Sequence, residues 1–383
     1  MKTHTIFILI LFLTFAFVQF TMAQGCVAIR NMGCSGANIG GSPSALFQQG
    51  DWQASLNYRY FRSYRHFRGR EEEVHRVQEG TEVINIFNSA DIGLSYGISN
   101  RLSLLISLPV IMNDRSSMYE HYGNSVAANP DRGRFHTHSA GIGDLRLSAN
   151  YWLIDPAAHS KGNLALGLGI KAPTGNANVQ GNFHKLDEKG ENYTIRRAVD
   201  QSIQLGDGGW GFSVEVQGFQ ALWARTALYI SGFYLFNPRN INNTLRNVGL
   251  DPADSYSYLS VPDQYAARLG LSYFSGENLS LSIGVRVEGI PTNDAIGQSD
   301  GFRRPGYIVS AEPGIAYLYK QMAFNLNVPV ALVRNRTRNT RDIATNRHGD
   351  AAFADYLVNA GVVWRFSKEH NATFKKWEDL KEK

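Results

Sequence analysis

The feature that most constrains this chain is a repeated alternation of apolar and polar side chains. Residues 279–287 show it most clearly, because Leu, Leu, Ile, Val and Val occupy the odd positions while Ser, Ser, Gly and Arg lie between them. Residues 52–61 and 356–366 follow the same pattern. Successive side chains of a β-strand point to opposite faces, so each segment has one apolar and one largely polar face. Segments of about ten residues match the length of a tilted strand that crosses a bilayer.

We identify about twelve such segments, and the links between them alternate in length. The segments cover 52–62, 83–96, 102–111, 140–153, 163–173, 210–222, 226–236, 264–273, 279–289, 307–317, 323–333 and 354–366. Short links cover 97–101, 155–162, 223–225, 275–278 and 318–321, and long polar links cover 63–82, 112–139, 174–209, 237–263, 290–306 and 334–353. Bacterial outer-membrane barrels have an even number of strands, short periplasmic turns and long outer loops. The sequence therefore predicts an all-β fold, a transmembrane antiparallel β-barrel of about 12 strands in a bacterial outer membrane.

A secreted β-sandwich also has alternating strands, and its outward charges face solvent. Aromatic residues near the segment ends favour the membrane barrel, because they resemble the girdles found at the two membrane interfaces. These residues are Trp52, Tyr60, Tyr96, Tyr151, Tyr265, Tyr273, Tyr307, Tyr317, Tyr356, Trp364 and Phe366. A helical membrane protein is disfavoured, because no run of roughly 20 apolar residues follows the N-terminal segment.

The N-terminal segment is typical of a secretory signal peptide. Lys2 precedes an apolar run at residues 6–20, and Thr21-Met22-Ala23 provides small residues at the expected places before a cut. We predict a signal peptide at 1–23, a periplasmic segment at 24–51, the barrel at 52–366 and a polar periplasmic tail at 367–383. The alternative is a lipoprotein signal with an acylated Cys26, although the residues before it lack the usual Leu.

The chain has two cysteines, Cys26 and Cys34, both near the predicted mature N-terminus. In an exported protein this spacing predicts a local disulfide. A zinc site is the alternative, but two thiolates without a nearby His or further Cys leave a tetrahedral ion short of ligands. His136 and His138 have the alternate spacing of a metal half-site, which is the weaker reading of this pair. We predict neither a metal nor a cofactor.

Positive residues gather in two clusters between the apolar segments, in a chain of net charge +5. The clusters are Arg62, Arg65, His66, Arg68 and Arg70, and Arg334, Arg336, Arg338, Arg341 and Arg347. On a secreted barrel both fall on outer loops, where lipopolysaccharide phosphates or anionic solutes are better partners than nucleic acid. We predict contact with outer-membrane lipid and lipopolysaccharide, and none with nucleic acid.

The polar face of the predicted strands carries charged residues that face the lumen. They are Arg59, Asp91, Asp144, Arg146, Lys171, Glu215, Arg268, Arg286, Glu288, Glu312 and Arg365. Two interpretations are open: these charges line a pathway for solutes, or they pair across the lumen and satisfy one another. About twelve strands enclose an interior too wide for small side chains alone to fill, so passage depends on these charges and on loops that fold inward. The link at 174–209 is the candidate constriction or lid.

Three glycine-rich motifs occur in order along the chain. They are Gly141-Ile142-Gly143-Asp144-Leu145, Leu166-Gly167-Leu168-Gly169-Ile170-Lys171-Ala172-Pro173-Thr174-Gly175 and Gly206-Asp207-Gly208-Gly209-Trp210-Gly211. Their order and spacing resemble an outer-membrane β-barrel family named for the meta-pathway of phenol degradation, whose members are often described as transporters. The resemblance implies a transporter or porin-like barrel and suggests hydrophobic or aromatic solutes.

The C-terminus departs from the usual pattern of such barrels, which commonly stop at an aromatic residue that the barrel assembly machinery recognises. Phe366 fits that role, but residues 367–383 follow it.

Two functions from different classes follow from this architecture. The leading prediction is an outer-membrane channel or transporter for passive uptake or efflux of small solutes, including hydrophobic or aromatic ones, through a charged lumen. The alternative is a non-conducting barrel that presents basic surface loops to polysaccharide, lipopolysaccharide or a protein partner. We do not predict an enzyme, because the chain has no Gly-x-Ser-x-Gly nucleophile elbow and no other catalytic motif.

Overall fold

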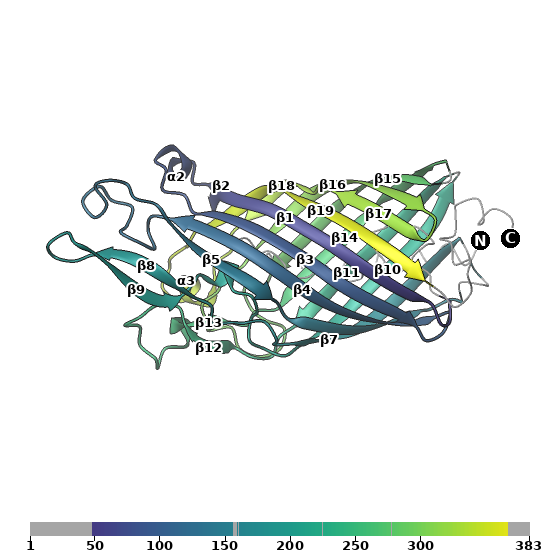
Figure 1. Ribbon diagram of the computed structural model, residues 1–383, viewed down its shortest axis with the longest axis horizontal. Helices are drawn as coiled ribbons and strands as arrows, with labels where there is room; N and C mark the ends of the chain where they lie inside the picture. The colour runs from purple at the N-terminus through teal and green to yellow at the C-terminus, as the bar shows by residue number, and fades with distance from the viewer. Residues whose placement is uncertain (1–47, 156–158, 160, 224, 277, 367–383) are drawn as a thin grey trace.

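The computed structural model describes residues 48–366, apart from residues 156–158, 160, 224 and 277. The predicted signal peptide, the predicted disulfide between Cys26 and Cys34, and the predicted polar tail at 367–383 lie outside the described residues. The remainder forms an antiparallel barrel whose strands run at a steep tilt, with long loops gathered at one end (Figure 1).

The barrel wall is built from a continuous antiparallel sheet. Its strands are β1 (Trp52–Arg68), β3 (Ile84–Gly97), β4 (Leu102–Ser117), β5 (Phe135–Ile142), β6 (Leu145–Trp152), β7 (Gly162–Ala172), β10 (Gly211–Trp223), β11 (Thr226–Phe236), β14 (Gln264–Ser275), β15 (Leu279–Ile290), β16 (Gly306–Tyr319), β17 (Met322–Asn327), β18 (Val330–Asn335) and β19 (Ala351–Phe366). The sheet closes because β19 pairs with β1, in a register that runs from Trp52 opposite Phe366 to Phe67 opposite Ala351. Closure leaves no unpaired sheet edge along the first and last strands.

Two positions in the wall hold interrupted strands. β5 and β6 both pair with β4 and are separated by Gly143 and Asp144. β17 and β18 both pair with β16 and β19 and are separated by Val328 and Pro329, where proline has no N–H to give to a neighbouring strand. When each pair counts as one strand, the described residues form a closed barrel of twelve strands, and the predicted fold class is confirmed.

The wall has an apolar outer face and a polar inner face. On β7, Leu164, Leu166, Leu168 and Ile170 are exposed, and Leu168 reaches 68% exposure, while the alternate side chains are buried. Such a continuous apolar exterior is stable against lipid and would be costly in water. At the end with short turns, the ring of Trp52 packs 4.7 Å from that of Tyr96, as expected of an interfacial aromatic girdle.

The long outer links contain secondary structure of their own. It comprises β2 (Glu71–Glu72), α2 (His75–Gln78), β8 (Gln180–Leu186), β9 (Asn192–Ala198), η3 (Gln201–Ile203), β12 (Ile241–Leu245), η4 (Ser255–Ser257), β13 (Tyr258–Ser260) and α3 (Thr340–Ala344). None of the described helices is long and apolar enough to cross a bilayer. β8 and β9 form a hairpin that projects beyond the barrel wall (Figure 1), although the sequence predicted only a loop at 174–209.

The two basic clusters are held largely by nearby carboxylates. Arg62, Arg65, His66 and Arg68 lie on the outer end of β1, which extends past the predicted end at residue 62. Arg65 contacts Asp355 at 2.7 Å, and Arg334 of the second cluster contacts the same carboxylate at 2.6 Å. These arginines therefore join loops and strand ends to one another.

Candidate functional site

The structure buries all eleven side chains that the sequence placed in the lumen. Asp144 lies at the break between β5 and β6, and the other ten lie on wall strands. The buried residues are Arg59, Asp91, Asp144, Arg146, Lys171, Arg268, Arg286, Glu288, Glu312 and Arg365, together with Glu215. The ten on wall strands are buried for a common reason, because their side chains point to the inner face while alternate positions on the same strands face lipid.

Five of these charges form one connected network. Arg59 on β1 contacts Glu288 on β15 at 2.8 Å, although β16, β17, β18 and β19 separate these strands in the wall. Arg286 donates from Nε to Glu288 at 2.6 Å and lies 3.5 Å from Glu312, which also pairs with Arg268. The contact between Arg59 and Glu288 therefore spans part of the interior. In this group the charges satisfy one another, which offsets the cost of burying them.

A second charged group fastens the outer link at 174–209 to the wall. Lys171 pairs with Asp207 and lies 3.8 Å from Asp144. Asp144 accepts hydrogen bonds from the backbone N–H groups of Gly175 at 3.0 Å and Asp207 at 3.1 Å. The three glycine-rich motifs meet here, and a Cβ on Gly175 would lie only 2.8 Å from Cα of Gly206. Glycine is required because the two backbones approach so closely.

Other polar side chains of the lumen have atoms without a hydrogen-bond partner in the described part of the chain. Neither terminal nitrogen of Arg146 nor Oδ1 of Asp91 has a hydrogen-bond partner among the described residues, although Arg146 packs 5.2 Å from the ring centre of Phe233. The same holds for at least one buried side-chain atom of Ser55, Asn150, Asn325 and Asn359. Buried polar groups without partners are costly, and water is the usual partner when protein supplies none. This part of the interior is therefore suited to hold water.

A short inward segment, residues 199–209, lies between the outer mouth and the polar lumen. Asp200 at its start lines the outer cavity, whereas Leu205 and Asp207 line a smaller pocket in the lumen. Leu205 packs against Phe61, Phe87, Ile111 and Leu357, which point inward from four wall strands. The segment begins with η3, where Asp200 caps the turn by accepting from the N–H of Ser202 at 3.0 Å. The predicted link at 174–209 thus has two parts, a hairpin outside the wall and an apolar contact layer within it.

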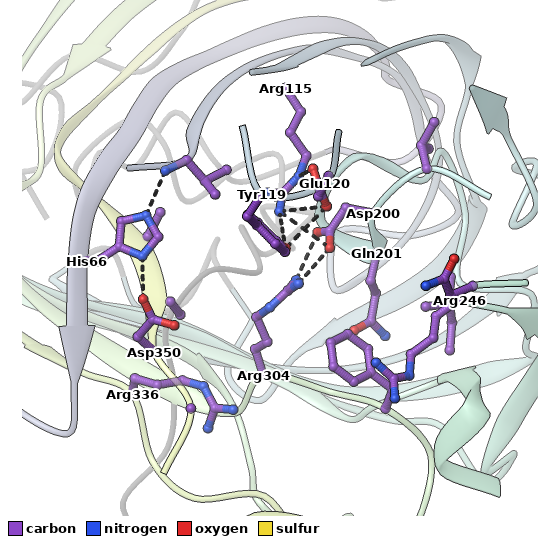
Figure 2. Close-up of a pocket in the computed structure, with 18 of the residues that line it drawn as sticks. His66, Arg115, Tyr119, Glu120, Asp200, Gln201, Arg246, Arg304, Arg336 and Asp350 are labelled. Atoms are coloured by element: carbon purple, nitrogen blue, oxygen red, sulfur yellow. Dashed lines mark hydrogen bonds and ion pairs between the residues drawn. The ribbon is translucent and has the colours of Figure 1, made fainter. Parts of the chain in front are cut away.

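The outer mouth contains a cavity of about 430 Å³ above this segment (Figure 2). Asp200 contacts Arg304 at 2.6 Å and Arg115 at 3.5 Å, and Arg115 also contacts Glu120 at 2.9 Å. Burial alone raises the pKa of Asp200, but the two guanidinium groups outweigh it and hold that pKa below its ordinary value. Asp350 behaves in the same way, because His66 and Arg76 lower its pKa against the effect of burial.

Sequence reasoning missed this outer cluster. Arg115, Glu120, Asp200 and Arg304 fall in three predicted outer links that are far apart in the sequence. No local sequence spacing predicts that these four side chains lie together. In addition, the third predicted segment ended at residue 111 and left Arg115 in a loop, whereas β4 continues to Ser117.

His136 and His138 lie on the outward face of β5 and both contact Asp114 on β4. Their Nδ1 atoms lie 2.9 Å and 2.8 Å from its carboxylate oxygens. Within the described part of the chain, no group of three or more His, Cys, Asp or Glu side chains is arranged to hold a metal ion.

Comparisons with known proteins support the fold. No protein-family model matches the chain, and no curated protein matches it. The structure is similar to that of an outer membrane channel from Pseudomonas putida F1, with 14% identity, a TM-score of 0.53, and coverage of 84% of this chain and 97% of that one. It also matches two toluene transporters. For Pseudomonas putida TodX the identity is 12% and the TM-score 0.41, with coverage of 91% of this chain and 100% of that one. For Ralstonia pickettii TbuX the identity is 9% and the TM-score 0.41, with coverage of 88% of this chain and 99% of that one.

The first of these similarities shows a shared barrel fold. Together with the apolar outer face and the aromatic girdle, this fold places the protein in a bacterial outer membrane, as the sequence predicted.

Proposed function

We propose that this protein is a passive channel for small solutes, including hydrophobic or aromatic ones, in the outer membrane. The observation that carries the proposal is the set of buried polar atoms in the lumen, beginning with those of Arg146 and Asp91, that find no hydrogen-bond partner among the residues the structure describes. A barrel with a dry, plugged core would satisfy such atoms with its own side chains. A lumen that holds water offers a route for solutes. The barrel fold shared with an outer membrane channel agrees with this proposal, as does the resemblance to the phenol meta-pathway family.

The proposal gives two parts of the barrel different roles. The network of Arg59, Glu288, Arg286, Glu312 and Arg268 narrows the lumen at its mid-section and sets its charge selectivity. The inward segment at 199–209 closes the outer side with the apolar contacts of Leu205. Because these contacts and the Lys171–Asp207 pair are noncovalent, the segment can be displaced without breaking the wall.

The alternative role as a non-conducting scaffold receives less support. That role needs basic loops free to bind polysaccharide, lipopolysaccharide or a protein partner. Arg65, Arg334 and Arg336 are instead engaged by Glu72, Asp355 and Asp342. We therefore propose a channel, with no enzymatic activity, that contacts lipid and lipopolysaccharide only as its surroundings.

Single-channel conductance of the refolded protein tests the proposal, with Arg59→Ala as the informative variant. Removal of this side chain deletes the contact that spans the interior to Glu288, so we expect a larger conductance and a shift in ion selectivity toward cations. Arg338→Ala is the matched control, because Arg338 is exposed on an outer link. The proposal fails if the wild-type protein shows neither conductance in planar bilayers nor solute uptake in liposomes.

A further inference from the structure

The outer cavity carries more positive than negative side chains. Six arginines line it: Arg76, Arg115, Arg197, Arg246, Arg304 and Arg336. The four acidic residues that line it are Glu120, Asp200, Asp342 and Asp350, and an arginine contacts each one. Among the described residues, no carboxylate lies within 4.0 Å of Arg197 or Arg246. The cavity therefore has two guanidinium groups whose charge the protein does not neutralise by direct pairing.

These two arginines are neighbours, because the side chain of Arg197 contacts the backbone of Arg246, and each guanidinium group is held in place. Nη1 of Arg197 donates to the backbone oxygen of Arg246 at 2.9 Å, and Nε of Arg246 donates to the backbone oxygen of Tyr256 at 3.0 Å. Arg197 packs 3.7 Å from the ring centre of Phe183, and Arg246 packs 4.8 Å from that of Phe302. In Figure 2, Arg246 lies apart from the Arg115, Asp200 and Arg304 cluster, and no interaction joins it to a carboxylate. Donor N–H groups on both arginines thus remain available to a ligand.

Burial makes these cations costly for the protein. Burial is the largest cause that lowers the pKa of both Arg197 and Arg246. The more distant carboxylates of Glu120 and Asp200 oppose it at Arg197, and Asp254 opposes it at Arg246, where Arg304 adds to the effect of burial. Arginine nevertheless stays charged near neutral pH. A bound anion would supply a countercharge in direct contact, and a carboxylate matches the planar fork of a guanidinium group with two parallel hydrogen bonds.

The wall beside the two arginines is apolar and aromatic. Val199, Leu259, Tyr256 and Phe302 line this part of the cavity. The volume of about 430 Å³ falls within the range of roughly 300 to 1,000 Å³ that is typical of small-molecule sites. A flat apolar body can therefore lie against the partly exposed rings of Phe302 and Tyr256 while its anionic group faces the arginines.

We propose that the outer cavity is a binding site for aromatic carboxylates, with Arg197 and Arg246 holding the carboxylate and Phe302 contacting the ring. The site lies on the outer side of the inward segment and would collect such anions before passage. This inference names the solute class of the proposed channel and in that respect rests on the proposed function.

Isothermal titration calorimetry on the full-length protein in detergent micelles tests the site without any flux measurement. The probes are 1-naphthoate, the neutral analogue 1-naphthylmethanol and inorganic phosphate. We expect naphthoate to bind at least tenfold more tightly than either of the other probes. Equal affinity for the neutral alcohol would overturn the role of the arginines, equal affinity for phosphate would overturn the role of the aromatic wall, and no naphthoate binding would overturn the whole inference.

Three variants separate a binding role from a structural one. Arg246→Gln and Arg197→Gln should each weaken naphthoate binding at least tenfold, while Arg197→Lys should weaken it less. Arg196→Gln is the matched control, since Arg196 is the adjacent, exposed residue on β9 and should leave affinity unchanged. Circular dichroism of each variant checks that the barrel is intact, and wild-type affinity in both glutamine variants would refute the assignment.

The outcomes also separate this inference from the proposed function. A protein that conducts but does not bind naphthoate refutes the binding site alone. A protein that binds naphthoate with the expected variant pattern, yet conducts nothing, refutes the channel and leaves the site standing.

Discussion

Acidification is expected to loosen the β8–β9 hairpin through His121, in the outer link after β4. The His121 side chain is 1% exposed, and its ring centre lies 5.3 Å from those of Phe135 and Phe183. Its Nδ1 lies 3.1 Å from the backbone N–H of His184 on β8 and accepts that hydrogen bond. The bond requires neutral His121 with its proton on Nε2. Protonation of Nδ1 would remove the acceptor and place a charge between two phenyl rings.

The size of the effect follows from the pKa of His121. Burial lowers that pKa to about 4, from an ordinary value of about 6.5. Because the folded-state pKa is the lower one, the stabilisation is complete above pH of about 6.5 and is lost as the pH falls toward 4. These two pKa values, combined through proton linkage, predict that the free energy of opening the β8–β9 hairpin falls by about 2 kcal/mol between pH 7.5 and pH 5.0. The population of molecules with an open hairpin then rises roughly thirtyfold.

Other charged groups face the same ring and must be separated from it experimentally. Glu120 acts on His121 in the opposite direction to burial, while His184, Lys185 and Arg197 act in the same direction. His121→Phe keeps the aromatic contacts and removes the titrating group, so the hairpin of this variant should open equally at both pH values. His75→Phe, at an exposed position on α2, should retain the wild-type pH dependence.

Hydrogen exchange of the β8 backbone amides, read by mass spectrometry and corrected for the intrinsic exchange rate, measures hairpin opening in the full-length protein. The expected result is a roughly thirtyfold loss of protection between pH 7.5 and 5.0 in the wild type. The reasoning is refuted if protection changes less than threefold, or if His121→Phe shows the same loss as the wild type.

Two further predictions concern the lumen. Gly206→Ala would place a Cβ 2.6 Å from Oδ1 of Asp144, so this substitution should displace the inward segment. Sucrose uptake by liposomes that contain the variant should then rise severalfold. Unchanged uptake would contradict the proposed closure of the outer side. Glu288→Gln leaves Arg59 and Arg286 without their shared carboxylate, so urea unfolding in micelles should show a loss of about 3 kcal/mol. Glu73→Gln, which breaks a half-exposed pair with Arg68, should cost no more than about 1 kcal/mol, and equal losses in the two variants would count against a buried network.

Most of the wall could be predicted from local pattern. Each of the twelve predicted segments overlaps an observed wall strand, and the segment at 323–333 covers most of β17 and β18. The segment at 140–153 covers β6 but only the last three residues of β5, which begins at Phe135 inside the predicted link 112–139. The break between β17 and β18 could not be placed because alternation continues across it. Between β5 and β6 the outward positions change from even-numbered to odd-numbered residues, so a change of phase marked that break. The β8–β9 hairpin was missed because its residues are mainly polar on both faces, so no apolar stripe marks it.

The candidate site was likewise predicted only in part. Alternation indicated which charges face inward, because facing is a property of each strand alone. It could not indicate that Arg59 meets Glu288, which lies 229 residues away, while Arg146 and Asp91 keep atoms without protein partners. The height of each side chain in the lumen depends on the stagger of every strand between them, and that stagger is fixed only when the sheet closes.

By itself, the sequence of this protein determined a closed membrane barrel with a polar, charged interior, because strand periodicity and lipid contact act on each segment independently. The tertiary structure alone decided which charges pair, that residues 199–209 turn inward, and that Arg197 and Arg246 line the outer cavity with no carboxylate of the described residues in contact. These features join residues from separate loops and strands, and their positions follow from packing around the whole barrel rather than from any local pattern.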